Sequence, residues 1–160
     1  MIRQAILAGG CFWGLEARFR QVQGVVDTLV GYTGGHTENP TYRDVCCDLT
    51  GHAEAVQVDY NPDQISYQDL LEAFFTFHDP TLCPSNSRIY TPQYRSAIFV
   101  ANDAERETAE QVIAFLECSG MYECDIITEV SDAGVFYPAE EYHQDYYRKH
   151  KVDITEDCLC

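Results

Sequence analysis

The chain has 160 residues, which is the usual size of one domain and long enough to bury a hydrophobic core. Hydrophobic residues make up 46% and charged residues 22% of the sequence, a globular composition that excludes a disordered protein. Acidic residues outnumber Lys and Arg by 26 to 10, and the net charge of -16 argues against nucleic acid or an anionic membrane surface as a partner.

The sequence contains no apolar run of about 18 residues, and its N-terminal apolar stretch is too short for a signal peptide. We therefore expect a cytoplasmic protein without membrane association. Eight cysteines in a reducing compartment should be mostly free thiols. Their presence favours catalysis or metal binding over a framework of structural disulfides.

The first half of the chain carries alternating strand and helix signals. Residues 2–8 are short and apolar, which predicts a strand that ends at a pair of glycines. Residues 12–23 have apolar side chains at three- and four-residue spacing, which predicts a helix with Cys11 at its N-terminus. Further strands are predicted over residues 25–32 and 53–60, with a loop between them over 33–40.

The second half continues with a helix that begins after Ser66 and extends to residue 77. A long loop over 79–92 contains three prolines, and long loops in compact domains are often functional. The remaining predicted elements are a strand over 96–100, a helix over 103–118, a strand over 125–130 and a partly helical segment over 136–150. Strands and helices mix without strict alternation, so we predict a single α+β domain over residues 1–150.

Cys11 is the residue with the clearest chemical meaning. A thiol at a helix N-terminus faces unpaired backbone N–H groups and the positive end of the helix dipole, which both favour the thiolate. The glycines on either side of it permit a tight turn and close approach of a ligand. Phe12 and Trp13 follow directly and could wall a pocket for a small apolar group. The same pattern alone is also typical of a buried cysteine between core aromatics.

The run Gly10-Cys11-Phe12-Trp13-Gly14, with Glu16, resembles the signature of the peptide methionine sulfoxide reductase A family. Six further stretches match the family in the same order, and together the matches span residues 4–150. They are Gly31-Tyr32-Thr33-Gly34-Gly35, Asn39-Pro40-Thr41-Tyr42, Thr50-Gly51-His52-Ala53-Glu54, His78-Asp79-Pro80-Thr81, Gln93-Tyr94-Arg95-Ser96 and Glu140-Glu141-Tyr142-His143-Gln144. Any one of these motifs is weak, but six in fixed order are a specific signal.

The resemblance implies an enzyme that reduces methionine S-sulfoxide, free or within proteins, to methionine. The Cys11 thiolate would attack the sulfoxide sulfur and become a sulfenic acid. Because oxygen leaves poorly unless it is protonated, an acid is needed, and the matching motif assigns this role to Glu54. Such a carboxyl should be partly buried and have a raised pKa. We expect the fold to be a two-layer sandwich in which helices flank a mixed or antiparallel sheet with a ferredoxin-like core.

The same resemblance assigns the remaining side chains of the site. Tyr42 and Tyr94 match the tyrosines whose hydroxyls hold the sulfoxide oxygen. Phe12 and Trp13 match the walls that hold the substrate methyl group. No metal and no bound cofactor are implied, and a monomer is expected.

A sulfenic acid requires a second thiol to resolve it. In the family this cysteine often lies in a flexible C-terminal tail, so residues 151–160 with Cys158 and Cys160 are the favoured candidates. Thioredoxin, or dithiothreitol in its place, would then reduce the disulfide by exchange. Cys46 and Cys83 remain rival resolving residues, whereas Cys118 and Cys124 flank a helix end and are expected to be structural.

One position departs from the family pattern. Family members usually carry an Asp five residues before the Tyr of the Gln-Tyr-Arg-Ser run, and this chain has Ile89 there. An aliphatic side chain cannot hydrogen-bond a ligand or orient a water molecule. One wall of the site is therefore expected to differ, with an effect on affinity, turnover or substrate preference.

Three other functions stay open from the residues alone. The Ile89 departure motivates a non-catalytic protein that binds or senses methionine sulfoxide. A metal-binding module could use cysteines and one histidine, although no Cys-x-x-Cys pair is present. Its candidate ligands are Cys46, Cys47, His143, Cys158 and Cys160. A Cys-His hydrolase with His52 or His143 as the base is the third alternative.

Overall fold

The structure is a computed structural model that describes residues 1–154, so that Cys158 and Cys160 of the predicted tail lie outside the described residues. Its strands are β1 (Arg3–Ala8), β2 (Val25–Thr33), β3 (Ala53–Tyr60), β4 (Ala97–Val100), β5 (Glu129–Asp132) and β6 (Tyr137–Pro138). Its helices are α1 (Phe12–Arg20), α2 (Tyr42–Cys46), α3 (Tyr67–Thr76), α4 (Asp103–Cys118) and α5 (Tyr146–Lys149), with single 3-10 turns at Ser87–Tyr90 and Glu141–His143.

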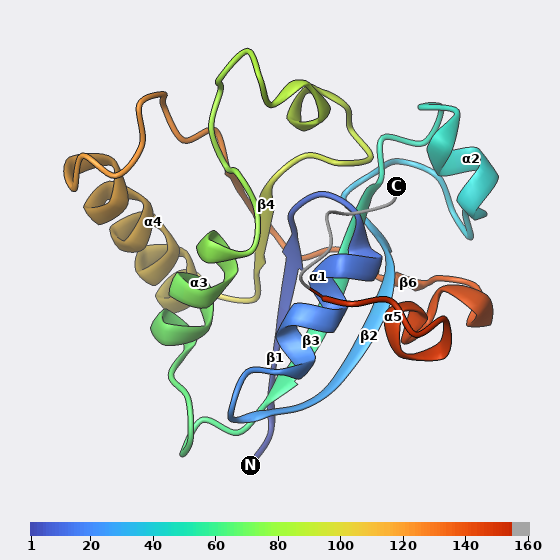
Figure 1. The fold of residues 1–160 in the computed structure, drawn as a ribbon, viewed down its shortest axis with the longest axis horizontal. Helices are drawn as coiled ribbons and strands as arrows, with labels where there is room; N and C mark the ends of the chain where they lie inside the picture. Colours follow the sequence, from blue (N-terminus) through green and yellow to red (C-terminus); the bar gives the residue numbers. More distant parts are fainter. Residues whose placement is uncertain (155–160) are drawn as a thin grey trace.

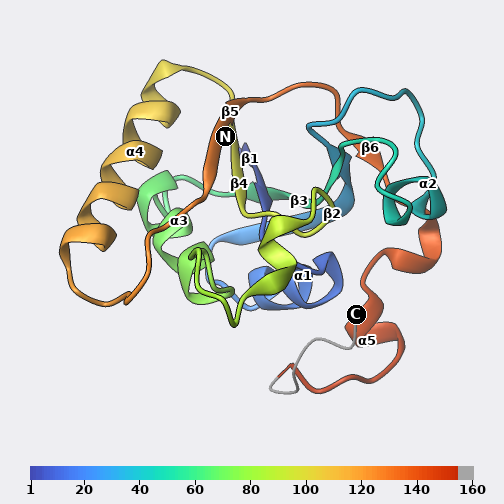
Figure 2. The same ribbon diagram turned by 90° about the horizontal axis from the view of Figure 1, so that it is seen from above.

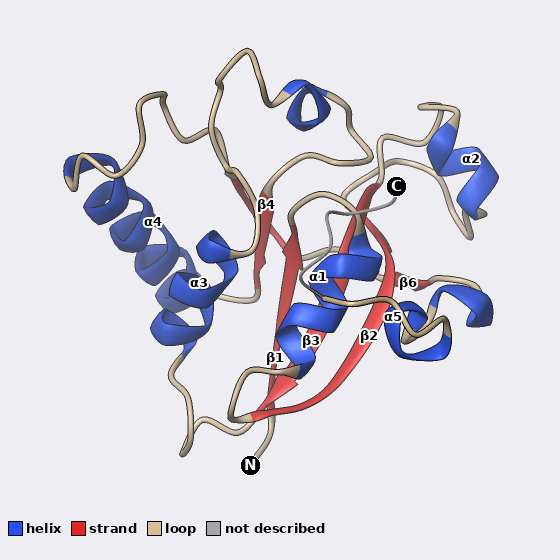
Figure 3. Ribbon diagram, viewed as in Figure 1, coloured by secondary structure: helices blue, strands red, loops and turns tan. Residues whose placement is uncertain are grey.

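The strands form one sheet in the order β5-β4-β1-β3-β2-β6 (Figures 1 and 3). The four central strands are antiparallel to one another, and α1 and α3 connect them in the split βαβ pattern of a ferredoxin-like core. At one edge β5 joins parallel to β4 through the crossover helix α4, and at the other β6 pairs antiparallel with β2. The prediction of an α+β fold with a mixed sheet is confirmed.

Helices α1, α3 and α4 share one core with one face of the sheet, and alternate strand residues point to its opposite sides. On β3, Val56 and Val58 belong to the main core with α1, α3 and α4, whereas Ala53 and Ala55 belong to a smaller cluster with Phe99 on the other face. Figure 2 shows α1 beneath the sheet and α4 beyond its β4–β5 end. The main core therefore lies between the sheet and the helix that begins after Cys11.

Side-chain caps fix where the helices begin. The Ser66 side chain accepts a hydrogen bond from the Asp69 N–H at the start of α3, as the sequence predicts. Thr41 and Asp44 form a reciprocal capping box around α2, a five-residue helix that the sequence analysis did not predict. Helix α2 carries Tyr42 at its first position, so this box also places a candidate site residue.

The strand predicted over 125–130 begins later, at residue 129, and this part of the prediction is wrong. The backbone before β5 pairs with the 79–92 loop instead. Leu82 N–H donates to the Asp125 carbonyl at 2.9 Å, and Ile127 N–H donates to the Pro80 carbonyl at 2.9 Å. These bonds satisfy the backbone of both segments outside the sheet.

The core contains no methionine side chain. The two methionines of the sequence, Met1 and Met121, are 92% and 68% exposed. Within residues 1–154, no helix has the length and apolar character needed to cross a bilayer.

Candidate active site

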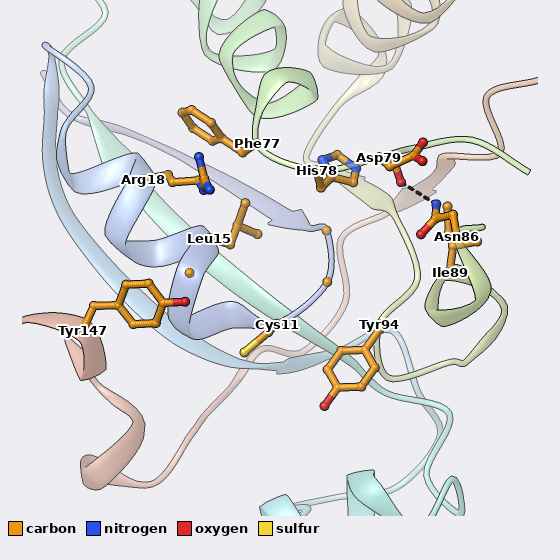
Figure 4. Close-up of a pocket in the computed structure, with 13 residues that line it drawn as sticks. Cys11, Leu15, Arg18, Phe77, His78, Asp79, Asn86, Ile89, Tyr94 and Tyr147 are labelled. Atoms are coloured by element: carbon orange, nitrogen blue, oxygen red, sulfur yellow. Dashed lines mark hydrogen bonds between the residues drawn. The ribbon is translucent and has the colours of Figure 1, made fainter. Parts of the chain in front are cut away.

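Cys11 is the N-cap residue of α1, at the turn that follows β1 (Figure 4). The turn needs glycine at two positions. Gly10 has a φ of 85°, in the left-handed region, and a Cβ at Gly9 would lie 2.9 Å from the ring of half-buried His78. Cys11 is 7% exposed and is disulfide-bonded in the structure, so the thiolate that attacks a substrate is its reduced form.

A cavity of about 250 Å³ lies beside Cys11. Tyr94 and Ile89 line it from one side, and Tyr147 lines it from the other (Figure 4). Tyr147 can approach because residue 14 is glycine, since a Cβ there would lie 3.2 Å from the Tyr147 hydroxyl. The Gly-Cys-Phe-Trp-Gly run thus shapes the cavity as well as the turn.

Glu54 lies on β3 and is 1% exposed. Its Oε1 accepts a hydrogen bond of 3.2 Å from the Phe12 N–H, the first backbone donor of α1 after Cys11. Its Oε2 accepts a bond of 2.6 Å from the Gln93 side chain. Burial raises the pKa of Glu54 from 4.5 to about 7, against the lowering effect of these two hydrogen bonds. Glu54 therefore has the burial and the raised pKa that were expected of the acid.

Tyr42 and Tyr94 are half-buried. Burial raises the pKa of Tyr42, a hydrogen bond with Cys46 raises it further, and the charges of Glu54 and Tyr94 add to the effect. Tyr42 is therefore close enough to both Glu54 and Tyr94 for their charges to affect its pKa. Tyr94 also lines the cavity beside Cys11, whereas Tyr42 does not.

The two predicted substrate-binding aromatics differ in exposure. Phe12 is 1% exposed, and its ring packs on Tyr32 and His143 within the core. Trp13 is half-buried and stacks on Tyr146, with ring centroids 3.7 Å apart. Its Nε1–H donates to Nδ1 of His143 at 2.9 Å. Neither residue lines the cavity, so their contact with a substrate stays a prediction.

The sequence analysis gave three residues of the site no role in sulfoxide reduction, although it named His143 as a possible metal ligand or hydrolase base. Gln93 holds Glu54 through the bond described above, and its amide also lies 3.3 Å from the Cys46 sulfur. Glu140 accepts bonds from the Tyr32 hydroxyl and from the Tyr42 N–H. His143 is fully buried among aromatic rings, and burial lowers its pKa. All three lie in motifs that match the family, and this match was the only sequence signal for them. Their contacts could not be predicted because their partners are distant in sequence.

The cysteines correct one expectation. Cys83 and Cys124 form a disulfide with their Cα atoms 5.5 Å apart, so the expectation of mostly free thiols is wrong for this pair. Cys83 is consequently not a free thiol that could resolve Cys11. Among the described residues, Cys46, Cys47 and Cys118 are free and exposed.

The other candidate sites find less support in the geometry. Residues 1–154 contain no group of three or more Cys, His, Asp or Glu side chains arranged to hold a metal ion. Both ring nitrogens of His52 lie within hydrogen-bonding distance of the backbone of residues 35–37, at Gly35 N and Thr37 O, and His143 already accepts from Trp13. Neither histidine lines the cavity with Cys11.

Comparisons with known proteins agree with this geometry. Residues 3–157 match the family model described as peptide methionine sulfoxide reductase. A protein of Methanothermobacter thermautotrophicus named peptide methionine sulfoxide reductase MsrA is 50% identical over 147 residues, which cover 92% of this chain and 87% of the relative.

Solved structures give the same result. The structure of reduced Mxr1 from Saccharomyces cerevisiae superposes with a TM-score of 0.84 at 34% identity, and covers 95% of this chain and 87% of its own. Mxr1 solved in complex with Trx2 has a TM-score of 0.62 at 28% identity, over 91% of this chain and 84% of its own. The chain belongs to the peptide methionine sulfoxide reductase family.

Proposed function

We propose that this protein is a peptide-methionine (S)-S-oxide reductase with Cys11 as its nucleophile. The thiolate attacks the sulfoxide sulfur, the oxygen passes to Cys11 with one proton, and methionine leaves. The observation that carries the proposal is the meeting of Cys11 and Glu54 at one helix end. Cys11 is the N-cap of α1, and the Glu54 carboxyl binds the next backbone N–H.

Glu54 supplies the proton. A group with a pKa of about 7 is partly protonated at neutral pH and can still release its proton, which suits a general acid. We assign the hydroxyls of Tyr42 and Tyr94 to hold the sulfoxide oxygen while this proton is transferred. The raised pKa of Tyr42 keeps its hydroxyl protonated and able to donate.

We assign the substrate methyl group to Trp13, backed by Phe12. Trp13 cannot turn freely, because it is stacked on Tyr146 and hydrogen-bonded to His143. A fixed aromatic face can bind a methyl group at little entropic cost. Phe12, buried below, supports this arrangement by packing on His143.

A second thiol then resolves the Cys11 sulfenic acid with release of water. We propose Cys158 or Cys160 for this step, and Cys46 as the rival among the free cysteines described. A thioredoxin dithiol would return the disulfide to two thiols. The yeast relative solved with Trx2 supports this partner. We further propose that the enzyme is a cytoplasmic monomer and needs no bound cofactor.

Turnover of a methionine sulfoxide peptide with dithiothreitol and with thioredoxin tests the activity. We expect methionine formation by the wild-type chain and none by Cys11→Ser. Binding of the peptide without turnover would favour the sensing alternative instead.

Peptide mapping after one equivalent of substrate without reductant tests the resolving step. We expect Cys11 paired with Cys158 or Cys160. A Cys11–Cys46 disulfide would assign resolution to the rival, and an unmodified Cys11 without any new disulfide would contradict the scheme.

A further inference from the structure

The loop over residues 79–92 forms one wall of the cavity beside Cys11 through Asn86 and Ile89. Figure 1 shows this loop standing above β4, outside the sheet. At its base it is bound to the segment that follows α4, by a bridge between Thr81 and Ile126 and by the backbone bonds before β5. The part of the loop beyond this base, which includes Asn86 and Ile89, is not paired with the segment after α4 and is held by other contacts.

The Cys83–Cys124 disulfide fastens the loop above this base. Cys83 is directly connected to the cavity wall, since the Asn86 N–H donates to the Cys83 carbonyl at 2.9 Å. The Asn86 side chain turns back and donates to the carbonyls of Asp79 at 2.8 Å and Thr81 at 3.0 Å (Figure 4). Asn86 and Cys83 therefore form one small unit with the base of the loop, and the disulfide ties that unit to Cys124.

This disulfide is accessible to a reductant. Cys83 and Cys124 are both half-buried, and the residues next to them in the chain are exposed. Cys83 also borders an open hollow of about 460 Å³ that shares His78 and Asp79 with the cavity at Cys11. A thiol can approach the bond from this hollow, since exchange requires access to one sulfur.

We propose that Cys83–Cys124 is a second redox-active disulfide, which fixes the Asn86–Ile89 wall and makes substrate affinity depend on the redox state. A dithiol of the thioredoxin class gives two electrons and two protons, the S–S bond breaks into two thiols, and the dithiol becomes a disulfide. Hydrogen peroxide reverses this step: two thiols and one peroxide give the disulfide and two waters. The inference rests on the proposed function, because it assumes that substrate binds at the Cys11 cavity.

Reduction should weaken binding rather than abolish it. Without the disulfide, the upper loop keeps the partly exposed hydrogen bonds of Asn86 and the packing of Ile89, and segments with so few contacts open locally. Substrate must then order the wall as it binds, which costs affinity. We expect the Kd to rise about fivefold, which corresponds to about 1 kcal/mol.

The test uses a Cys11→Ser chain, in which substrate binds without reacting. Calorimetric titration with an N-acetylated, amidated methionine sulfoxide would compare the chain oxidised by peroxide with the same chain reduced by dithiothreitol. Cys83→Ser with Cys124→Ser in this background should behave like the reduced form under both conditions. Cys118→Ser is the matched control, because Cys118 is a free exposed cysteine at the end of α4, and it should retain the redox response.

Two results would overturn the proposal. One is an equal Kd, and equal deuterium exchange over residues 79–92, in the oxidised and reduced chains. The other is the absence of alkylation at Cys83 and Cys124 after thioredoxin has fully reduced Cys11 in the wild-type chain, because unlabelled cysteines would show that their disulfide was not reduced. If neither form binds substrate and the wild-type chain shows no turnover, the proposed function itself fails. A difference in deuterium exchange over residues 79–92 between the oxidised and reduced chains would then still show that the disulfide controls the loop.

Discussion

The two sides of Cys11 are built in different ways. On the Glu54 side, long-range hydrogen bonds hold the proposed acid and the backbone of one tyrosine: Glu54 binds Phe12 and Gln93, and Glu140 binds Tyr42. On the Ile89 side, the wall is a loop, its central side chain is aliphatic, and a disulfide fastens it. The sheet therefore fixes the side proposed for proton transfer. The loop side is fastened by the disulfide instead, and it carries the departure from the family pattern at Ile89.

The largest expected effect comes from Glu54→Gln, which removes the proposed proton donor on the Glu54 side of Cys11. It keeps the shape and one acceptor but removes the proton, so kcat/KM should fall by about 100-fold or more. In the wild-type chain kcat/KM should decline as pH rises through about 7, where Glu54 loses its proton, and the variant should lack this decline.

Glu16→Gln is the matched control for this kinetic comparison. Glu16 is also a buried carboxyl with a raised pKa, caused first by burial, and it binds Thr28 and the Asp145 N–H. Its hydrogen bonds go to Thr28 and Asp145 and not to the Phe12 N–H beside Cys11, so kcat/KM should stay within about tenfold of wild type, below the loss expected for an acid. Equal losses in both variants would mean that Glu54 has only a structural role.

Glu54→Gln should also stabilise the fold at high pH. Because the pKa of Glu54 is about 7 in the folded chain and near 4.5 when exposed, the folded chain binds more protons between these values. The contribution of the protonated Glu54 carboxyl to stability is therefore fully present below pH 4.5 and is lost as pH rises through 7. Glu54→Gln should therefore be more stable than wild type by roughly 2–3 kcal/mol at pH 8, and nearly equal at pH 4. Urea unfolding at both pH values measures this, and a pH-independent difference would contradict it.

Ile89→Asp sharpens the comparison on the second side. It introduces a group that can hydrogen-bond a ligand or a water in the cavity, so we expect kcat/KM to rise about fivefold. Because Ile89 is 6% exposed, the variant should also lose about 1–3 kcal/mol of stability. Ile89→Val keeps the wall apolar and should change kcat/KM by less than about twofold. Identical kinetics for the Asp variant and wild type would show that this position is neutral.

The smallest effect is expected for Gln93→Leu. The Gln93 amide lowers the pKa of Glu54, so its loss should raise that pKa and move the alkaline decline of kcat/KM upward by about half a pH unit. Gln111→Leu on the exposed face of α4 is the control and should leave the profile in place. A downward shift would mean that Gln93 does not act through the Glu54 carboxylate.

The sequence predicts local features of this molecule better than distant contacts. The bounds of β3 and α4 agree with the prediction because alternation and a capped amphipathic helix are local signals. Helix α2 was missed because five residues carry too little periodicity. The start of β5 was misplaced because its preceding residues pair with a loop about 45 positions earlier, for example Ile127 with Pro80.

The same limit applies to the candidate site. Cys11 was predicted at its helix end, and Glu54 was predicted to be buried with a raised pKa, and both are so in the structure. Gln93 and Glu140 were missed because their partners lie 39 and 98 residues away. The Cys83–Cys124 bond was missed because cysteine spacing does not determine pairing, and a reducing compartment argued against it.

The two methionines described earlier have a consequence for the durability of the protein. Oxidation turns an apolar methionine into a polar sulfoxide and disrupts a core that contains one. Both methionines of this chain are largely exposed, so oxidation of either one leaves its internal packing intact. An oxidising solution can thus disrupt the cores of other proteins through their methionines while the core of this fold stays packed.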